Sequence, residues 1–490
     1  MTTMSYYVII KYYEFVIYYL RSFQVNIKKL FAPSDMTEGA PLNKIIMFAF
    51  PMLIGNIAQQ LYSTVDSIVV GKYVGDNALA AVGSASPVYN LLLVLFMGVS
   101  VGSSIMVSQY FGAKDKESLA KSIGNSLSLT AVVSLIIMAL SLVVVDPMLT
   151  LLGTPESIFS WCHDYLFILL MGIAGMSYYN ILSGVLRGLG DSVSALIYLL
   201  VACVINIVLD IFFVANLKMG VAGVALATVI AQAVSAVLCL FRILKMTDVF
   251  HLRKSSLRME KKYSMDILRL GMPSGLTQAI FSLAMVMVQS LTNSFGEMVI
   301  AANVIIMRVD GFAMMPNFSF GTAMTTYAGQ NVGAKKYDRV DQGAKSGTLL
   351  AMGVSATITI IILLFGNILM YAFTDTAELV DLSMRMMRIL AVGYVAMAVT
   401  QCLSGIMRGA GDTVSPMWIS IFTTVIVRVP LAYAIAFMTR TPEAPTGNYR
   451  ATFVSLLVSW LMGALITTVI YKRKKWKEKA IAVHGLPEEA

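Results

Sequence analysis

The sequence contains few charged residues, few cysteines and few histidines, and each shortage argues against a class of protein. Only 13% of the 490 residues are charged, whereas about 25% are charged in typical soluble domains. The four cysteines include no CxxC pair and are typical of small apolar positions, and the three histidines are scattered. The phosphate-binding loop GxxxxGK followed by Ser or Thr is missing, which argues against an ATP-driven pump. An ordinary soluble domain, a Cys/His metal centre and a nucleotide-driven motor are thus disfavoured.

The chain is rich in long runs of apolar residues. Hydrophobic residues make up 58% of the chain, and a run of about 20 such residues is long enough to cross a bilayer. The runs lack the alternation of a transmembrane barrel, so helices are expected, because a helix satisfies its own backbone groups in lipid. We predict an all-α integral membrane protein with twelve spans at 43–70, 80–108, 122–145, 162–186, 192–214, 220–241, 264–293, 298–326, 347–370, 381–406, 414–437 and 450–471.

Basic residues gather in alternate loops, which predicts the orientation of the helices. One set of loops, together with the C-terminal tail, carries most of the lysines and arginines, whereas the other set holds only Lys72, Lys218, Arg440 and Arg450. Basic residues in short loops stay on the cytoplasmic side. We therefore expect a multi-pass protein of the cell membrane with both termini cytoplasmic. The net charge of +9 then follows from topology, and no nucleic-acid partner is expected.

The second half of the chain repeats the first. SGVLRGLGDS at 183–192 returns as SGIMRGAGDT at 404–413, and QYFGAKDK at 109–116 returns as QNVGAKKY at 330–337, both at an offset of 221 residues. Six spans per half is an even number, so both halves enter the membrane from the same side. Two six-helix lobes related by an axis along the membrane normal are therefore predicted, as in transporters that rock one bundle against another.

The paired RGxGD turns fall in very short connections. Glycine permits the tight bend and the aspartate can cap the following helix, so we interpret Arg187, Asp191, Arg408 and Asp412 as structural turns. The predicted division of the chain is an N-terminal cytoplasmic or interfacial segment at 1–40, a first lobe at 41–245, a linker at 246–263, a second lobe at 264–471 and a basic tail at 472–490. Translation from Met36 instead of Met1 remains an alternative.

The run TVDSIVVGKYVGDNALAAVG at 64–83, the two RGxGD turns, the QxxGAK loops and the NxxxDxxF pattern resemble the multidrug and toxic compound extrusion (MATE) family. The resemblance covers residues 40–470. It implies a twelve-helix, two-lobe antiporter that exports organic, often cationic, compounds while H+ or Na+ moves inward. It also implies small organic substrates, no enzymatic activity and no tightly bound cofactor, and we expect the chain to function as a monomer in the lipid bilayer.

Two carboxylates within the apolar runs of the first lobe, Asp66 and Asp210, have no acidic counterpart at the equivalent positions of the second lobe. Asn206 and Asp210 are four residues apart and share a helix face, but the repeat places Val427 and Leu431 at the equivalent positions. An ionised carboxylate at depth costs about 2.5 kcal/mol or more, so Asp210 is interpreted as functional. The resemblance implies a cation-coupling site at residues matching Asp66, Asn206, Asp210 and Thr228, with Na+ at the first three as a candidate ligand set. Oxygen ligands suit a hard cation, and two close carboxylates also suit a shared proton.

The second lobe has a different set of candidates. Its intramembrane charges are Arg308, Asp310 and Arg428. The branch of the family that looks most sodium-dependent carries a seventh-helix Glu and a tenth-helix Asp, and the corresponding stretches here contain no acid, so no cation site is expected in this lobe. The chain has 33 methionines, and methionine side chains adapt to varied ligands. The candidate substrate cleft comprises Met314, Met315, Phe318, Arg308 and Arg428, with lipid-facing or helix-packing surface as the alternative.

Two other functions stay open. Lipid-linked oligosaccharide flippases resemble this family distantly and would need a basic central cavity, for which Arg308 and Arg428 are candidates. A polytopic membrane enzyme would need a polar catalytic cluster near one face, whereas no histidine lies deep in a predicted span. The antiporter is the preferred interpretation.

Overall fold

The protein is seen here in a computed structural model that describes residues 33–151, 153–442 and 444–481. Within these ranges the chain is helical, and the only β-pairing is an isolated bridge between Thr441 and Ala444. The prediction of an all-α membrane protein is confirmed. Most of the predicted interfacial segment and the last nine residues lie outside the described part of the chain.

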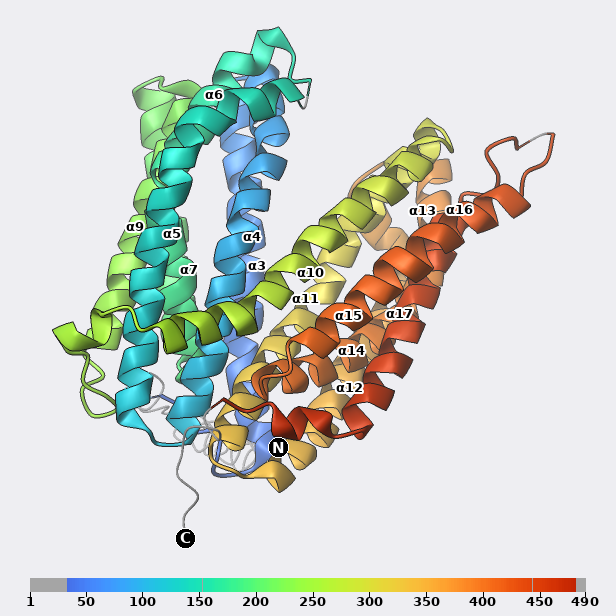
Figure 1. Cartoon of the computed structure of the whole chain (residues 1–490). Coiled ribbons are helices and arrows are strands. Elements are labelled where there is room, and N and C mark those ends of the chain that lie inside the picture. The colour runs from blue at the N-terminus through green and yellow to red at the C-terminus, as the bar shows by residue number, and fades with distance from the viewer. Residues whose placement is uncertain (1–32, 152, 443, 482–490) are drawn as a thin grey trace, which may run out of the picture.

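The helices of the first half run in chain order from the N-terminus (Figure 1). They are α3 (Pro41–Tyr73), α4 (Asp76–Gly112), α5 (Lys116–Leu151), α6 (Glu156–Met171), α7 (Ile173–Gly188), α8 (Ser192–Asp210), the π-helical turn η1 (Ile211–Asn216) and α9 (Gly220–Leu244). The short 3-10 helix η2 (Lys254–Leu257) lies in the linker between the halves.

The helices of the second half repeat this order. They are α10 (Lys261–Asn293), α11 (Glu297–Gly333), α12 (Tyr337–Tyr371), α13 (Ala377–Ala391), α14 (Gly393–Gly409), α15 (Val414–Ile421), the π-helical segment η3 (Phe422–Arg428), α16 (Val429–Met438) and α17 (Arg450–Lys472). The 3-10 helix η4 (Lys475–Glu478) follows at the C-terminal end.

Ten of the described helical segments are long and apolar enough to cross a membrane, and the number rises to twelve if each of two bent pairs is one span. The predicted span 162–186 breaks between α6 and α7 with a bend of 51°, and 381–406 breaks between α13 and α14 with a bend of 42°. Both breaks occur at crowded glycines. A Cβ on Gly172 would lie 2.3 Å from Cγ2 of Val229, and one on Gly393 would lie 2.5 Å from Cε3 of Trp460.

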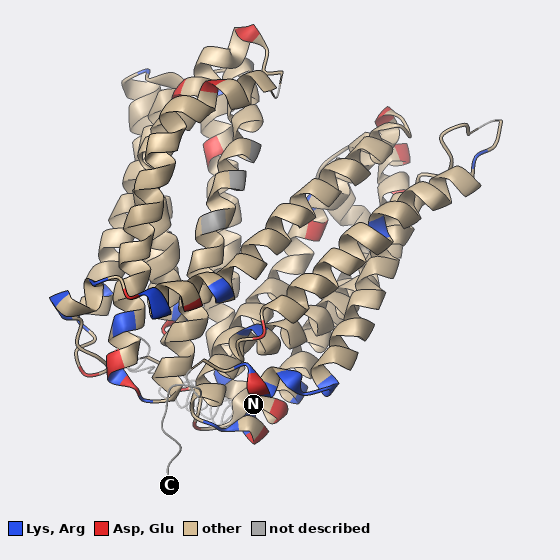
Figure 2. Ribbon diagram, in the orientation of Figure 1, with Lys and Arg blue, Asp and Glu red and all other residues tan. Residues whose placement is uncertain are grey.

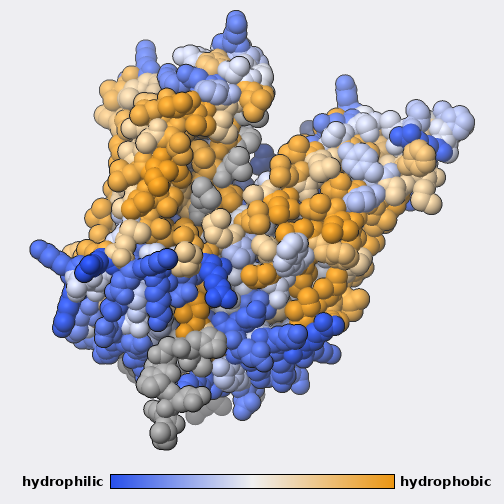
Figure 3. Space-filling model, viewed as in Figure 1, coloured by the Kyte–Doolittle hydropathy of each residue, from blue (hydrophilic) through white to orange (hydrophobic). Residues whose placement is uncertain are grey.

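The two halves form two lobes that meet at one end and diverge at the other (Figure 1). The lobes pack against each other through α4 with α10 and α11, and through α3 with α11 and α12. A notch between the lobes remains visible in the space-filling view at the diverging end (Figure 3). We call this end the open end.

The first helix of each half begins in the core of the other lobe. Ile45 and Phe48 at the start of α3 pack with residues of α11, α12 and α14, whereas Ile267 and Leu270 at the start of α10 pack with the first lobe. Beyond Pro51 and Pro273, which lie inside the two helices, each helix continues along its own half. The lobes are therefore interlocked where they meet.

Charge and hydropathy divide the surface into zones. Lysine and arginine gather at the end where the lobes meet (Figure 2), and apolar side chains cover the flanks of both lobes above it (Figure 3). We call the end with the basic residues the basic end. An apolar flank bordered by a basic end is the surface expected of a protein embedded in a bilayer.

Candidate functional site

Three helices of the first lobe bring the predicted cation-site residues together. Asp66 lies on α3, Asn206 and Asp210 lie one turn apart on α8, and Thr228 lies on α9. Helix α8 packs against both α3 and α9. The Nδ2 group of Asn206 donates to Oγ1 of Thr228 at 3.4 Å, and the carboxyl groups of Asp66 and Asp210 lie near enough for the charge of one to act on the other, without a hydrogen bond between them.

Four oxygen atoms of this group are buried without a hydrogen-bond donor among the described residues. The side chains of Asn206 and Asp210 are fully buried, and Asp66 is partly buried. Oδ1 of Asp66, Oδ1 of Asn206 and both carboxyl oxygens of Asp210 have no hydrogen-bond partner among the described residues. Buried polar groups are hydrogen-bonded in most native structures, so unpartnered acceptors call for an explanation such as an ion. The cluster is thus an oxygen-rich acceptor site that lacks an internal cation.

Tyr62 is a member of this group that the sequence analysis missed. Its hydroxyl donates to Oγ1 of Thr228 at 3.4 Å, so Thr228 connects α3 and α8 through α9. Tyr62 precedes Asp66 by four residues, and residues four apart share a helix face. That spacing was the available signal, but a tyrosine in an apolar run is also common in packing.

A change of helix type begins directly after Asp210. Helix α8 ends at Asp210, and the next turn, η1, is π-helical. The second lobe has a π-helical segment too, η3, which ends at Arg428. Single π-helical turns occur frequently at functional sites because they interrupt the regular backbone hydrogen bonding. Both buried charges therefore adjoin an irregular backbone.

The second-lobe candidates do not form one cluster. Arg428 is 5% exposed and directs Nη1 and Nη2 toward Sδ of Met285 at 3.8 Å, and its Nε has no partner among the described residues. Arg308 is exposed. Met314 and Met315 are buried within the lobe, whereas Phe318 is 51% exposed. In this conformation, Phe318 and Arg308 offer surface and the two methionines do not.

The paired turns have structural contacts. Asp191 is the N-cap of α8 and accepts from the backbone N–H of Ser194 at 2.9 Å and from Nε of Arg242 at 3.0 Å. Asp412 accepts from the backbone N–H of Ser415 at 3.2 Å in the second lobe. Arg187 donates to Oγ of Ser183 at 2.9 Å, and Arg408 lies in the last turn of α14.

The two halves also match one family model. The model described as MatE matches residues 51–212 and again residues 273–434. The chain belongs to the MatE family. Each match begins at one of the two prolines, Pro51 and Pro273, where α3 and α10 cross from one lobe into the other.

Relatives and solved structures of the MatE family are similar over nearly the full length. The probable multidrug resistance protein YoeA of Bacillus subtilis is 30% identical over 444 residues, covering 89% of this chain and 94% of the relative. The probable multidrug resistance protein NorM of Thermotoga maritima is 25% identical over 443 residues, covering 89% of this chain and 94% of the relative.

The fold matches solved MATE structures as well. A structure described as the outward-facing conformation of a multidrug resistance MATE family transporter has a TM-score of 0.83 at 25% identity, covering 90% of this chain and 97% of that one. A MOP superfamily transporter from Pyrococcus furiosus has a TM-score of 0.82 with the same identity and coverage. This MatE family member is therefore a multi-pass membrane transporter of the multidrug efflux class and not an enzyme.

Proposed function

We propose that this MatE transporter is a secondary active antiporter that exports organic, often cationic, compounds in exchange for inward H+ or Na+. The observation that carries the proposal is the pair of acids Asp66 and Asp210, which share a buried site with four unpartnered oxygen atoms. Two carboxylates in a low dielectric cannot both stay ionised without a compensating cation. The site would therefore take up a cation from one side of the membrane and release it on the other.

The residues suit both coupling ions. A proton shared between the two carboxyls would remove one charge and supply one donor. Sodium would be bound by the carboxyl oxygens with Oδ1 of Asn206, since hard cations prefer oxygen ligands. No group of three or more His, Cys, Asp or Glu residues suited to a metal occurs in the described ranges, so any metal binding here depends on the amide as well.

The orientation follows from the charges. We propose that the basic end faces the cytoplasm, since lysine and arginine gather there (Figure 2). The open end would then face outward, and closing it while parting the basic end would expose the space between the lobes to the cytoplasm. Both lobes and the cation site belong to one chain, which supports a monomer as the working unit.

Transport by purified protein in liposomes tests the proposal. We would load proteoliposomes with a fluorescent organic cation, impose a pH or Na+ gradient, and compare the wild type with Asp210→Asn. We expect uphill efflux with one of the two gradients and its loss in the variant, because an amide cannot exchange a proton or supply the ionic ligand. The matched control is Asp381→Asn, an exposed carboxylate in an i,i+4 pair with Arg385, which should keep full coupling. Full coupled transport by Asp210→Asn would refute the proposed site.

A further inference from the structure

The two duplicated QxxGAK glutamines reach across the junction of the lobes. Nε2 of Gln109, on α4 of the first lobe, donates to the carbonyl of Gly409 at 2.9 Å in the second lobe. Nε2 of Gln330, on α11 of the second lobe, donates to the carbonyl of Gly188 at 3.1 Å in the first lobe. Each acceptor belongs to the other lobe's RGxGD turn. The two repeated motifs of the sequence therefore pair with each other crosswise at the basic end.

The same glutamines hold the two ends of the described chain. Oε1 of Gln330 accepts from the backbone N–H of Met36 at 2.8 Å, and Oε1 of Gln109 accepts from the backbone N–H of Ile481 at 2.9 Å. Each amide thus donates through nitrogen to a carbonyl and accepts through oxygen from an N–H. These partners require one orientation of each amide, because a flipped amide would face both partners with the wrong atom.

Both chain ends straddle the two lobes. Ser34 donates its backbone N–H to the carbonyl of Gly190 in the first lobe at 3.3 Å, whereas Met36, two residues on, is buried in the core of the second lobe. At the other end, Trp476 is buried in the core of the second lobe, and Ile481 packs against the first. Neither segment can stay in place on both lobes if the basic end parts.

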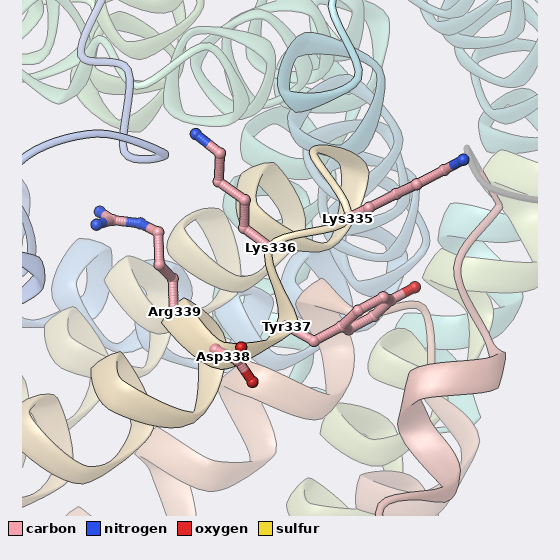
Figure 4. A pocket seen from close by; sticks show the side chains of 5 residues that line it. All are labelled: Lys335, Lys336, Tyr337, Asp338 and Arg339. Atoms are coloured by element: carbon pink, nitrogen blue, oxygen red, sulfur yellow. The ribbon is translucent and has the colours of Figure 1, made fainter.

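Basic side chains anchor the N-terminal segment on the second lobe. Arg339 donates to the carbonyls of Met36 and Gly39 at 3.1 and 2.9 Å, and Nζ of Lys336 donates to the carbonyl of Thr37 at 3.1 Å. Figure 4 shows Lys336 and Arg339 extending to the same side of the turn that precedes α12, while Tyr337 and Asp338 point elsewhere. The segment is therefore carried by the second lobe through charged donors.

The glycines of the same motif let the backbones touch. A Cβ on Gly112 would lie 1.9 Å from the carbonyl oxygen of Gln330, and a Cβ on Gly333 would lie 1.9 Å from that of Gln109. Gln109 and Gln330 are themselves fully buried. Backbone contact of this kind leaves no room for water between the two helices, so the cross-lobe hydrogen bonds are shielded from solvent. Separating α4 from α11 would break both of them at once.

We propose that Gln109 and Gln330, with the chain ends that they hold, form a latch at the basic end that sets the balance between the two access states. Resting on the proposed antiport function, the inference assigns the glutamines a positioning role without contact to drug or cation. To part the basic end, the protein has to break the hydrogen bonds of Gln109 and Gln330 to the other lobe. Each chain end also has to lose its contacts with one of the two lobes. The latch therefore favours the conformation in which the opposite end is open.

Spin labels at the open end would measure this balance without any transport. Glu156→Cys and Glu378→Cys place labels on exposed first-turn residues of α6 and α13, and the four native cysteines are buried. In lipid, without drug or ion gradient, we expect the wild type to show mainly the long inter-lobe distance. Gln109→Ala and Gln330→Ala should each raise the ratio of short to long distances about tenfold, since each variant loses both the bond to the other lobe's carbonyl and the bond to a chain end, each of modest net strength.

Further variants keep the result interpretable. Gln342→Ala, an exposed glutamine on α12, should match the wild type. Truncation before Ile481 should act like Gln109→Ala because it removes the backbone N–H that Gln109 holds while keeping Trp476 in place, and it remains informative if a glutamine variant does not fold. Distance ratios equal to wild type in both glutamine variants and in the truncation would overturn the latch. Because these distances need no coupling, they are independent of the efflux test at Asp210.

Discussion

At the scale of single residues, buried carboxylates in this protein fall into two kinds. Both carboxyl oxygens of Asp191 have partners. Oδ1 accepts from the backbone N–H of Ser194, and Oδ2 pairs with the guanidinium of Arg242, with 3.0 Å between Nη2 and Oδ2. Asp210 is equally buried, but its two oxygens have no donor among the described residues. A carboxylate of the first kind stabilises the fold, whereas one of the second kind costs stability and is retained for another reason.

This contrast predicts opposite effects of the same substitution. Asp191→Asn should lower the free energy of unfolding by about 2 kcal/mol, because it removes the negative charge that accepts from Ser194 and from the Arg242 guanidinium. Asp210→Asn should leave it unchanged or raise it, because the uncompensated charge is removed. Thermal unfolding of both variants in the same detergent measures the difference. A lower Tm for Asp210→Asn than for Asp191→Asn would mean that Asp210 is mainly a structural residue.

The sequence predicted the acidic residues of the site better than its neutral ones. A carboxylate in an apolar run is conspicuous because its burial is costly, so Asp66 and Asp210 stood out in the sequence, while their assignment to a cation site came from the family resemblance and stays a prediction. Tyr62 carries no such cost. Gln109 and Gln330 were visible as a repeat, but their partners are backbone carbonyls of the other lobe, and nothing in a sequence marks which carbonyl a side chain reaches.

At the scale of helices, close packing depends on glycine at the lobe junction. A Cβ on Gly102 of α4 would lie 2.1 Å from the carbonyl oxygen of Ile267 on α10, and one on Gly271 would lie 2.1 Å from that of Gly98. Small residues let transmembrane helices approach closely, and dispersion between their backbones then holds them together. The contact between α4 and α10 is therefore a backbone contact between the two lobes.

Gly102→Ala should disturb this contact. The added methyl group has a rigid carbonyl beside it, so α4 and α10 must separate, and we expect a loss of about 2 kcal/mol in the free energy of unfolding. Gly83→Ala on the same helix is the control, because apart from its chain neighbours and the nearby backbone of its own helix no atom lies within 4 Å of the added Cβ. Thermal unfolding of the two variants measures this loss. Equal Tm values would show that separating α4 from α10 does not lower the stability of the protein.

Helix number and helix shape differed in how well the sequence predicted them. Runs of apolar residues located all twelve predicted spans, since length and hydropathy decide what crosses a bilayer. The bends of 51° and 42° and the π-helical turns were not predicted. Gly172 is one of many glycines in the chain, and only its contact with Val229 distinguishes it. The exchange of helix starts between the lobes is likewise a property of packing between distant segments.

At the scale of the whole molecule, the proposed exchange is limited by the energy in the ion gradient. One elementary charge crossing about 100 mV supplies roughly 2.3 kcal/mol, and a tenfold gradient needs about 1.4 kcal/mol. One inward monovalent cation could thus sustain a gradient of a neutral compound of roughly fifty-fold. Export of a monovalent cation in the same exchange gains nothing from the voltage, so the concentration gradient of the coupling ion must drive it.

Alternating access links these energies to the structure. The lobes diverge at the open end and are joined at the basic end (Figure 1), so in the proposed cycle the second state requires the basic end to part and the open end to close. Drug and ion then compete by favouring different states, and each can shift the balance only by its difference in affinity for the two. Coupling between two ligands is reciprocal, so a drug gradient must also drive the ion.

The most direct measurement of antiport is therefore to drive the ion with a drug gradient, the reverse of driving the drug with an ion gradient. Proteoliposomes with no initial pH or Na+ gradient and no voltage would receive a gradient of an organic cation, and internal pH and Na+ would be followed with fluorescent indicators. We expect one ion to move uphill against the drug in the wild type and in Asp381→Asn, and neither ion to move in Asp210→Asn. Drug movement without ion movement in the wild type would contradict antiport and favour a passive pathway or a flippase.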